Sequence, residues 1–183
     1  MTIRAFLAVT LPEEVRNRVA EAARLFPGLV ALKPSAIHLT MRFLGDIEDP
    51  APIVDAIRPI IATHPAFEIE IAGLGAFPKR QEASIVWAGL SKGGLAAGVL
   101  AAGIEAALVP VGFPREARPW KGHVTIGRFA SPKRLRREIF ETDSPFGSAA
   151  VRDVVLYKST LSPEGAVHEP LADLPLGGAG GEA

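Results

Sequence analysis

Two short stretches guide the interpretation of this chain: residues 38–41, His-Leu-Thr-Met, and residues 123–126, His-Val-Thr-Ile. Each contains a histidine, an apolar residue, a threonine and a second apolar residue. In a β-strand, residues i and i+2 project from the same face. Each stretch therefore places an imidazole and a hydroxyl on one face and two apolar side chains on the other. The repeated pattern predicts two equivalent strands, each presenting a polar pair to a common surface.

The sequence around these stretches predicts the same order of elements twice. Alternating or β-forming segments predict strands, and apolar residues at helical spacing predict helices. In chain order we expect a strand at 3–9, a helix at 12–26, a strand at 37–44, a helix at 52–63 and a strand at 67–74, then a strand at 84–90, a helix at 94–108, a strand at 122–129, a helix at 133–141 and a strand at 151–157. We interpret this order as an internal duplication, with repeats at about residues 1–80 and 81–160 of one domain spanning 1–175.

Composition places the chain among single-domain globular proteins. Its 183 residues, of which 48% are hydrophobic and 22% charged, suffice for one sizeable core. Cysteine is absent, which excludes disulfides, thiolate zinc sites and a cysteine nucleophile. No apolar stretch reaches the roughly 20 residues of a membrane-spanning helix, so we expect a cytoplasmic protein without a membrane partner, and we take it to be a monomer. Residues 176–183 are glycine-rich and predict a flexible tail.

The two polar pairs suit acid–base chemistry at a phosphorus atom. If a pseudo-two-fold relates the halves, two imidazoles and two hydroxyls face each other across a cleft. One imidazole then takes a proton from the attacking water or hydroxyl, and the other protonates the leaving oxygen. Threonine hydroxyls donate to phosphate oxygens. We therefore predict His38 and His123 as the catalytic pair and Thr40 and Thr125 as phosphate ligands.

Other kinds of site find little support in the sequence. Neither motif histidine has an aspartate or glutamate at metal-ligand spacing, so we expect no metal and no cofactor. The chain has no Walker A pattern and no Gly-x-Ser-x-Gly elbow. A single His-x-Thr is usually structural, with its histidine hydrogen-bonded near a strand end. Two such motifs at matched positions favour the catalytic interpretation.

The extended motif blocks resemble the two-histidine phosphoesterase superfamily, and specifically the bacterial and archaeal RNA 2',3'-cyclic phosphodiesterases, also called 2'-5' RNA ligases. The resemblance runs through residues 4–8, 38–45, 73–78, 118–128 and 157–159. It implies a bilobal, internally duplicated α+β fold, with antiparallel sheets flanking a central cleft and helices on the outside. Gly122, where the family usually has proline, and His168, where tyrosine is expected, depart from the family pattern.

The resemblance also implies a reaction. This is hydrolysis of an RNA-end 2',3'-cyclic phosphate to a 2'-phosphate, with reversible, ATP-independent 2'-5' joining of RNA ends. We expect His123 to be the base and His38 the acid, although pseudo-symmetry allows the reverse. Two alternatives stay open: a phosphodiesterase acting on a small cyclic or linear nucleotide, and a non-catalytic module that binds RNA ends.

Four further residues are candidates for substrate contacts. Arg42 shares the parity of the first motif, so a regular strand places it near a phosphate; a solvent-facing arginine is the alternative. Arg128 has the wrong parity unless a bulge at Gly127 re-aims it, and the resemblance favours it as a phosphate ligand. Trp120 and Phe6 could stack on a nucleobase. For Phe6, core packing is the alternative.

The net charge of zero is a sum of unlike segments. Residues 1–114 carry 10 basic and 11 acidic side chains, residues 115–137 carry 8 and 1, and residues 138–183 carry 2 and 8. The basic excess falls on the segment that contains His123. We therefore expect a local field that attracts a phosphate or an RNA end.

Overall fold

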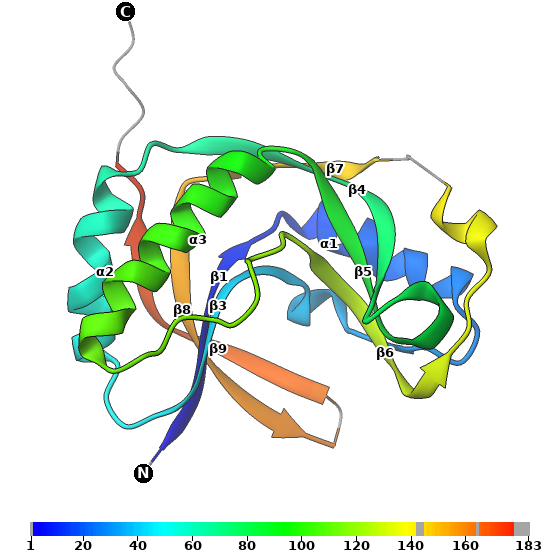
Figure 1. Cartoon of the computed structure of the whole chain (residues 1–183), viewed down its shortest axis with the longest axis horizontal. Coiled ribbons are helices and arrows are strands. Elements are labelled where there is room, and N and C mark those ends of the chain that lie inside the picture. Colours follow the sequence, from blue (N-terminus) through cyan, green and yellow to red (C-terminus); the bar gives the residue numbers. More distant parts are fainter. Residues whose placement is uncertain (1, 142–144, 164, 178–183) are drawn as a thin grey trace, which may run out of the picture.

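The computed structural model describes residues 2–141, 145–163 and 165–177 of the chain. Its strands form one curled antiparallel sheet in the order β7-β4-β5-β6-β3-β1-β8-β9, with β2 paired to β6 (Figure 1). The strands are β1 Ile3–Thr10, β2 Val30–Ala31, β3 His38–Ile47, β4 Phe67–Phe77, β5 Ala83–Lys92, β6 Val124–Lys133, β7 Pro145–Val151, β8 Asp153–Ser162 and β9 Gly165–Pro175. The expected α+β fold with antiparallel strands is confirmed.

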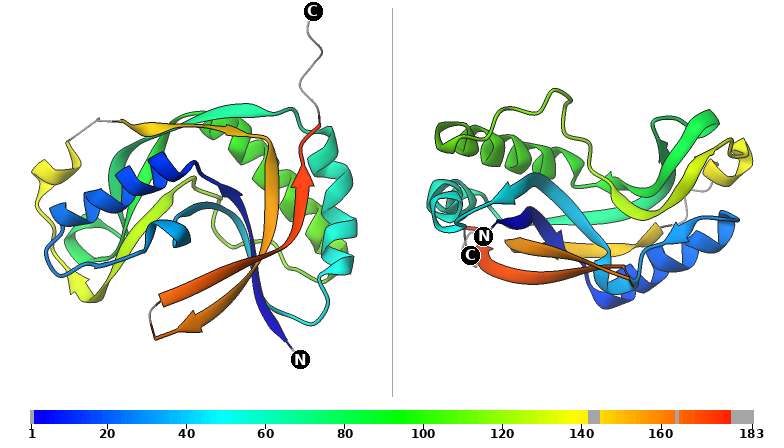
Figure 2. Two further views of the ribbon diagram at one scale, coloured as in Figure 1. Left: turned by 180° about the vertical axis from the view of Figure 1, so that it is seen from behind. Right: turned by 90° about the horizontal axis from the view of Figure 1, so that it is seen from below.

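The helices pack at two places on the sheet. They are α1 Glu13–Glu21, α2 Ala51–Thr63 and α3 Gly94–Leu108. Helices α2 and α3 lie side by side at one end of the sheet, whereas α1 packs on β7 (Figure 1). From behind and from below, α2 and α3 stay together and apart from α1, and the β8–β9 hairpin extends beyond the rest of the sheet (Figure 2). The helices lie on the outside of the sheet, as predicted. They leave the middle of the sheet uncovered on one side.

The sheet consists of two groups of four strands that meet at β3 and β6. One group is β3, β1, β8 and β9, and the other is β6, β5, β4 and β7. These groups do not coincide with the two halves of the sequence, because β4 joins the group of β5 and β8 joins the group of β1. Strand β4 of the first half thus lies with β5, and β8 and β9 of the second half lie with β1. This exchange ties the two groups together.

Apolar side chains on alternate residues build the core of this sheet. On β1, Ala5, Leu7 and Val9 are buried in the main hydrophobic cluster. Helix α2 contributes Ile57 and Ile61 to the same cluster, and the predicted helix continues through Pro59. Its proline lies well inside the helix. Burial of the apolar face thus outweighs the hydrogen bond that this proline removes.

Several elements differ from those predicted. The helix expected at 133–141 is wrong: β6 continues to Lys133, where it still pairs with β5, and a short 3-10 helix, η5 Arg137–Phe140, follows. Four cations at 133–137 repel one another and oppose a helix there. The first helix ends at Glu21 and continues as a 3-10 turn, η1 Ala22–Leu25. Strands β2, β7 and β9 were not expected.

The beginning of the expected flexible tail is ordered. Leu176 is buried, and the amide of Gly177 donates a hydrogen bond to the carbonyl of Ile61 in α2. Apolar burial at Leu176 therefore extends the fold beyond the predicted boundary. The remaining residues of that tail, 178–183, lie outside the described part of the chain.

Within the described part of the chain, one helix is long and apolar enough, by length and composition alone, to cross a membrane. It consists of α3 and the following turn, residues 94–111. In the fold, Leu100, Ile104 and Leu108 of this segment are fully buried in the core that α3 shares with α2 and β3. These residues of the segment therefore pack within the domain, whereas Leu95 and Val99 of the same helix are exposed.

The close approach of β2 to β6 is testable by adding a methyl group. A Cβ on Gly127 would lie 2.5 Å from the Val30 carbonyl oxygen and 2.9 Å from Leu29. We expect Gly127→Ala to lower the free energy of unfolding by about 1–3 kcal/mol, because the backbone of β2 must shift. Gly94→Ala is the control, since its nearest neighbour is 4.0 Å away, and it should retain full stability. Equal urea midpoints for Gly127→Ala and wild type would contradict this packing.

Candidate active site

The two His-x-Thr motifs meet where β3 pairs with β6. The residue between histidine and threonine in each motif forms this contact: Leu39 lies opposite Val124, and both side chains are fully buried. Extending the antiparallel register by one residue in each direction places His38 opposite Thr125. It likewise places Thr40 opposite the second histidine. The four polar side chains therefore share the opposite face of the sheet at its centre.

Strand β1 shows which residues of β3 share that face. Its alternate residues Phe6, Ala8 and Thr10 point to the same side, and they pair respectively with Phe43, Thr40 and His38. The register shifts between Leu7, which pairs with Arg42, and Ala8, which pairs with Thr40. One extra residue, Met41, therefore forms a bulge directly after the motif. Beyond this bulge, Phe43 and not Arg42 lies on the face of His38 and Thr40.

An equivalent bulge follows the second motif on β6. Trp87 pairs with Thr125, whereas Ile85, on the same face of β5, pairs with Arg128. The extra residue is Ile126, and its bulge brings Arg128 to the side of Thr125. The sequence suggested a bulge at Gly127, and the structure has it at Ile126, one residue earlier. In agreement with this placement, the charge of Arg128 contributes to lowering the pKa of His123.

The expectation that Arg42 faces a phosphate is wrong. The bulge turns this residue to the other face, where its guanidinium is buried. There it forms ion pairs with Glu116 at 2.7 Å and with Glu105 of α3 at 3.4 Å, and it donates to the carbonyl of Pro114. Two carboxylates already neutralise this cation. Arg42 therefore ties α3 and the segment before the second motif to β3.

His123 is held by the segment that precedes β6. Its Nδ1–H donates to the carbonyl oxygen of Lys121 at 2.8 Å, which leaves Nε2 with a free lone pair. The edge of its ring meets Phe77 at 4.9 Å. Burial lowers the pKa of His123, and the charges of Lys121 and Arg128 lower it further, against the opposing effect of the hydrogen bond. The ligand-free imidazole is therefore neutral at pH 7.

His38 lies against other aromatic rings. It stacks on Phe6 at 4.7 Å and meets the ring of His168 edge-on at 5.2 Å. Burial lowers the pKa of His38 to about 4, with further lowering from His168 and His123, while a hydrogen bond to the backbone of Ala36 opposes the shift. Each motif histidine thus hydrogen-bonds to the backbone two residues before it. This anchoring fixes both rings.

The base-stacking role considered for Phe6 is wrong. Its ring is buried between neighbouring rings, stacking on His38 and, at 5.4 Å, on Tyr157. The core-packing alternative is therefore correct, and the ring of Phe6 supports the imidazole of His38. The sequence did not indicate that His168 lies beside His38. His168 belongs to the unpredicted strand β9 and to neither His-x-Thr motif.

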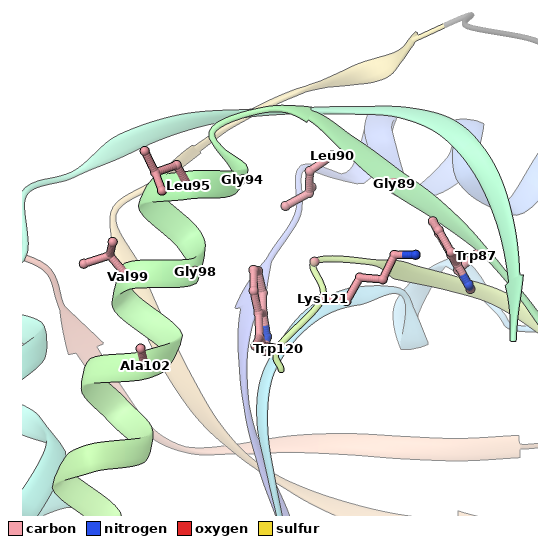
Figure 3. Close-up of a pocket in the computed structure, with 11 residues that line it drawn as sticks. Trp87, Gly89, Leu90, Gly94, Leu95, Gly98, Val99, Ala102, Trp120 and Lys121 are labelled. Carbon is pink, nitrogen blue, oxygen red and sulfur yellow. The ribbon is translucent and has the colours of Figure 1, made fainter. Parts of the chain in front are cut away.

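An apolar groove adjoins the second motif. It has a volume of about 630 Å³ and runs between α3 and the end of β5. Figure 3 shows Leu95, Val99 and Ala102 of α3 on one side, and Leu90, Trp120 and Lys121 on the other. Trp120 is half-buried, and its indole N–H donates to the carbonyl oxygen of Thr40 at 3.1 Å. Its ring thus lines the groove directly beside the first motif.

Lys121 brings a cation to this groove. Its Nζ lies 4.6 Å from the centre of the Trp87 ring and 5.7 Å from that of Phe77. These contacts hold the ammonium group near His123. In the sequence, the sign that Lys121 lies near this histidine is its position two residues before His123. Across the described ranges, no group of three or more histidine, cysteine, aspartate or glutamate side chains could hold a metal ion.

The shifted pKa values predict the titration of the ligand-free protein. In an NMR titration of the histidine rings, His38 should titrate near pH 4 and His123 below 6.5, because burial disfavours both imidazolium forms. Since unfolding frees both rings to bind protons, stability should fall as the pH drops below about 6.5. Inorganic phosphate should raise both pKa values, and His123→Gln assigns the signals. A ligand-free His38 that titrates at or above 6.5 would contradict this site.

Comparison with known proteins identifies the family. The model of the 2'-5' RNA ligase superfamily matches residues 11–162. Proteins named RNA 2',3'-cyclic phosphodiesterase are similar: that of Methanothermobacter thermautotrophicus is 30% identical over 178 residues (92% of this chain, 96% of that one), and that of Thermus thermophilus is 34% identical over 186 residues (96% and 91%). A solved structure from Thermus thermophilus has a TM-score of 0.78 at 28% identity (96% and 98%), and apo Escherichia coli LigT has 0.73 at 26% (96% and 98%). The chain therefore belongs to the 2'-5' RNA ligase superfamily and is a phosphoesterase.

Proposed function

We propose that this protein hydrolyses the 2',3'-cyclic phosphate at RNA ends to a 2'-phosphate, without a metal ion. The observation that carries the proposal is the meeting of the two His-x-Thr motifs at Leu39 and Val124. Relatives named RNA 2',3'-cyclic phosphodiesterase support this substrate, because they are similar over more than nine-tenths of the chain. The cations Lys121 and Arg128 beside His123 suit an anionic phosphodiester.

The proposed reaction is an in-line displacement at phosphorus. His123 takes a proton from water through Nε2, since its Nδ1–H is already donated to Lys121. The water oxygen forms a bond to phosphorus while the bond to the 3'-oxygen breaks. His38 gives its proton to that departing oxygen, so the phosphate stays on the 2'-oxygen. Thr40 and Thr125 donate to the non-bridging oxygens, where Arg128 also balances the developing charge.

The environments of the two imidazoles support these roles. The pKa of His38 is lowered to about 4, which makes its protonated form the stronger acid toward the leaving oxygen. His123, less deeply buried, is the base. Neither imidazole holds a proton firmly at neutral pH in the absence of a ligand. The negative charge of the bound phosphodiester raises the pKa of His38, so this imidazole takes up a proton from solvent when the substrate binds and can then act as the acid.

Joining of RNA ends follows from the same geometry. A 5'-hydroxyl in place of water attacks the cyclic phosphate, and the departing 3'-oxygen leaves a 2'-5' linkage. The strained cyclic ester replaces ATP as the source of free energy. Trp120, whose ring lines the groove, stacks in this proposal on the base of the incoming strand. We propose that the protein acts in this way as a cytoplasmic monomer on RNA ends.

Product analysis tests the reaction and its residues together. Wild type in EDTA should convert a cyclic-phosphate-ended oligoribonucleotide to a product with a terminal 2'-phosphate. His38→Ala and His123→Ala should each lower kcat by roughly 10²–10⁴-fold, because each loses one proton transfer. His64→Ala is the matched control, since His64 hydrogen-bonds to Pro65 outside the site and should keep full activity. Full activity of either motif variant, or turnover that requires added metal, would overturn the proposal.

A substrate with an improved leaving group distinguishes the acid from the base. Sulfur in place of the 3'-oxygen departs without protonation, so this substrate should restore most of the activity of His38→Ala. His123→Ala should stay impaired, because water still needs a base. The measurement is the ratio of rates on sulfur and oxygen substrates for each variant. Rescue of His123→Ala in place of His38→Ala would show that the two roles are exchanged.

A further inference from the structure

The segment that joins α3 to β6 leads to the second motif but has little regular structure of its own. Residues 114–122 lie between a 3-10 turn, η4 Val109–Val111, and β6 (Figure 1). Across the described ranges, these residues make no backbone–backbone hydrogen bond. The segment presents Trp120 and Lys121 to the groove and ends at His123. Its position therefore depends on contacts that involve side chains.

Two contacts from β3 hold this segment, one on each side of the bulge that follows the first motif. Before the bulge, the carbonyl oxygen of Thr40 accepts a hydrogen bond from the indole N–H of Trp120 at 3.1 Å. After the bulge, the guanidinium of Arg42 pairs with Glu116 at 2.7 Å and donates to the carbonyl of Pro114. The strand that carries the first motif thus holds the segment that leads to the second.

The Arg42 guanidinium also joins this segment to α3. Glu105 of α3 lies 3.4 Å from the guanidinium and accepts a hydrogen bond from the amide of Glu116 at 2.7 Å. The side chain of Arg42 is 7% exposed, whereas that of Glu116 is 56% exposed. A planar guanidinium presents several donors in one plane, so it serves both carboxylates and the Pro114 carbonyl at once. Arg42 therefore connects β3, α3 and residues 114–116 at a single point.

The first motif does not depend on the side chain of Arg42. His38 and Thr40 are placed by the pairing of β3 with β1 and β6, and the ring of His38 stacks on Phe6. Within the part of the chain that the structure describes, the polar contacts of the Arg42 side chain go to α3 and to residues 114–116. Loss of the guanidinium should therefore disturb the second motif and leave the first in place.

We propose that Arg42 is a positioning residue for the second motif, because it holds the segment that ends at His123. The proposal rests on the proposed function, in which His123 is the base. Arg42 touches no reacting atom and acts through residues 114–122, which set where Nε2 of His123 and Nζ of Lys121 lie. A reacting group displaced by about 1 Å can lose roughly 10²-fold in rate. An arginine on the strand of His38 thus serves the other histidine.

The substrates with oxygen and with sulfur at the 3' position test this role. Arg42→Met removes the guanidinium and keeps an apolar stem, and kcat on the cyclic-phosphate-ended RNA should fall roughly 10- to 100-fold. Sulfur should give no rescue, as for His123→Ala and unlike His38→Ala, because the impaired step is the activation of water. Arg42→Lys keeps the charge and should lose less. Val151→Ala, at a fully buried position on the outermost strand β7, is the control and should lower stability but keep the wild-type kcat.

An NMR titration of the histidine rings tests the role without a substrate. In Arg42→Met, the pKa of His123 should rise toward 6.5, because burial is the main cause that lowers it and a loosened segment exposes the ring. The pKa of His38 should stay at about 4, since β1 and β6 still hold its strand. A His123 pKa that keeps its wild-type value, or a shift confined to His38, would overturn the proposal.

The outcomes separate this role from the proposed function. If wild type does not cleave the RNA, the proposed function is overturned, and the titration still decides whether Arg42 positions His123. An unchanged kcat in Arg42→Met, or its rescue by sulfur as for His38→Ala, would overturn the positioning role alone. An equal fall in kcat for Val151→Ala would assign the loss to destabilisation and also overturn it. If the two histidines exchange roles, Arg42→Met should still follow His123→Ala.

Discussion

The structure depends on the contact between Leu39 and Val124 at the centre of the sheet. Each residue is the apolar member between a histidine and a threonine, and each is fully buried. Because alternate residues face opposite sides, burying these two side chains turns the four polar ones to the other face. The same packing that joins the two groups of strands therefore assembles the site. A polar residue at 39 or 124 would lose core burial and site geometry together.

Burial of the two imidazoles sets the chemistry of the site. It lowers both pKa values, and the nearby cations lower that of His123 further. In the proposed reaction, an anionic phosphodiester reverses this effect, so that the protonated state of the acid forms when the substrate is bound. The cations Lys121 and Arg128 belong to the basic segment that the net charge of zero conceals. Charge distribution along the chain was therefore more informative than net charge.

The sequence predicted the four motif residues and most of the long elements, because both follow from local periodicity. It could not predict that Arg42 lies on the buried face, because the alternation of side chains along β3 is interrupted by the bulge at Met41. A matching bulge at Ile126 makes Arg128 face the site despite its parity. Strand β9 and its His168 depend on pairing with β8 across a tight hairpin. Such tertiary contacts leave little trace in local sequence patterns.

The central claim is that both imidazoles act on one phosphorus atom in one transition state. A double-mutant cycle with His38→Ala, His123→Ala and the double variant, measured as kcat/KM on a cyclic-phosphate-ended RNA, tests it most directly. Groups that act as a unit are strongly non-additive, so the double variant should be only slightly slower than the slower single variant. Losses that multiply in the double variant would show independent contributions and contradict a single two-histidine site.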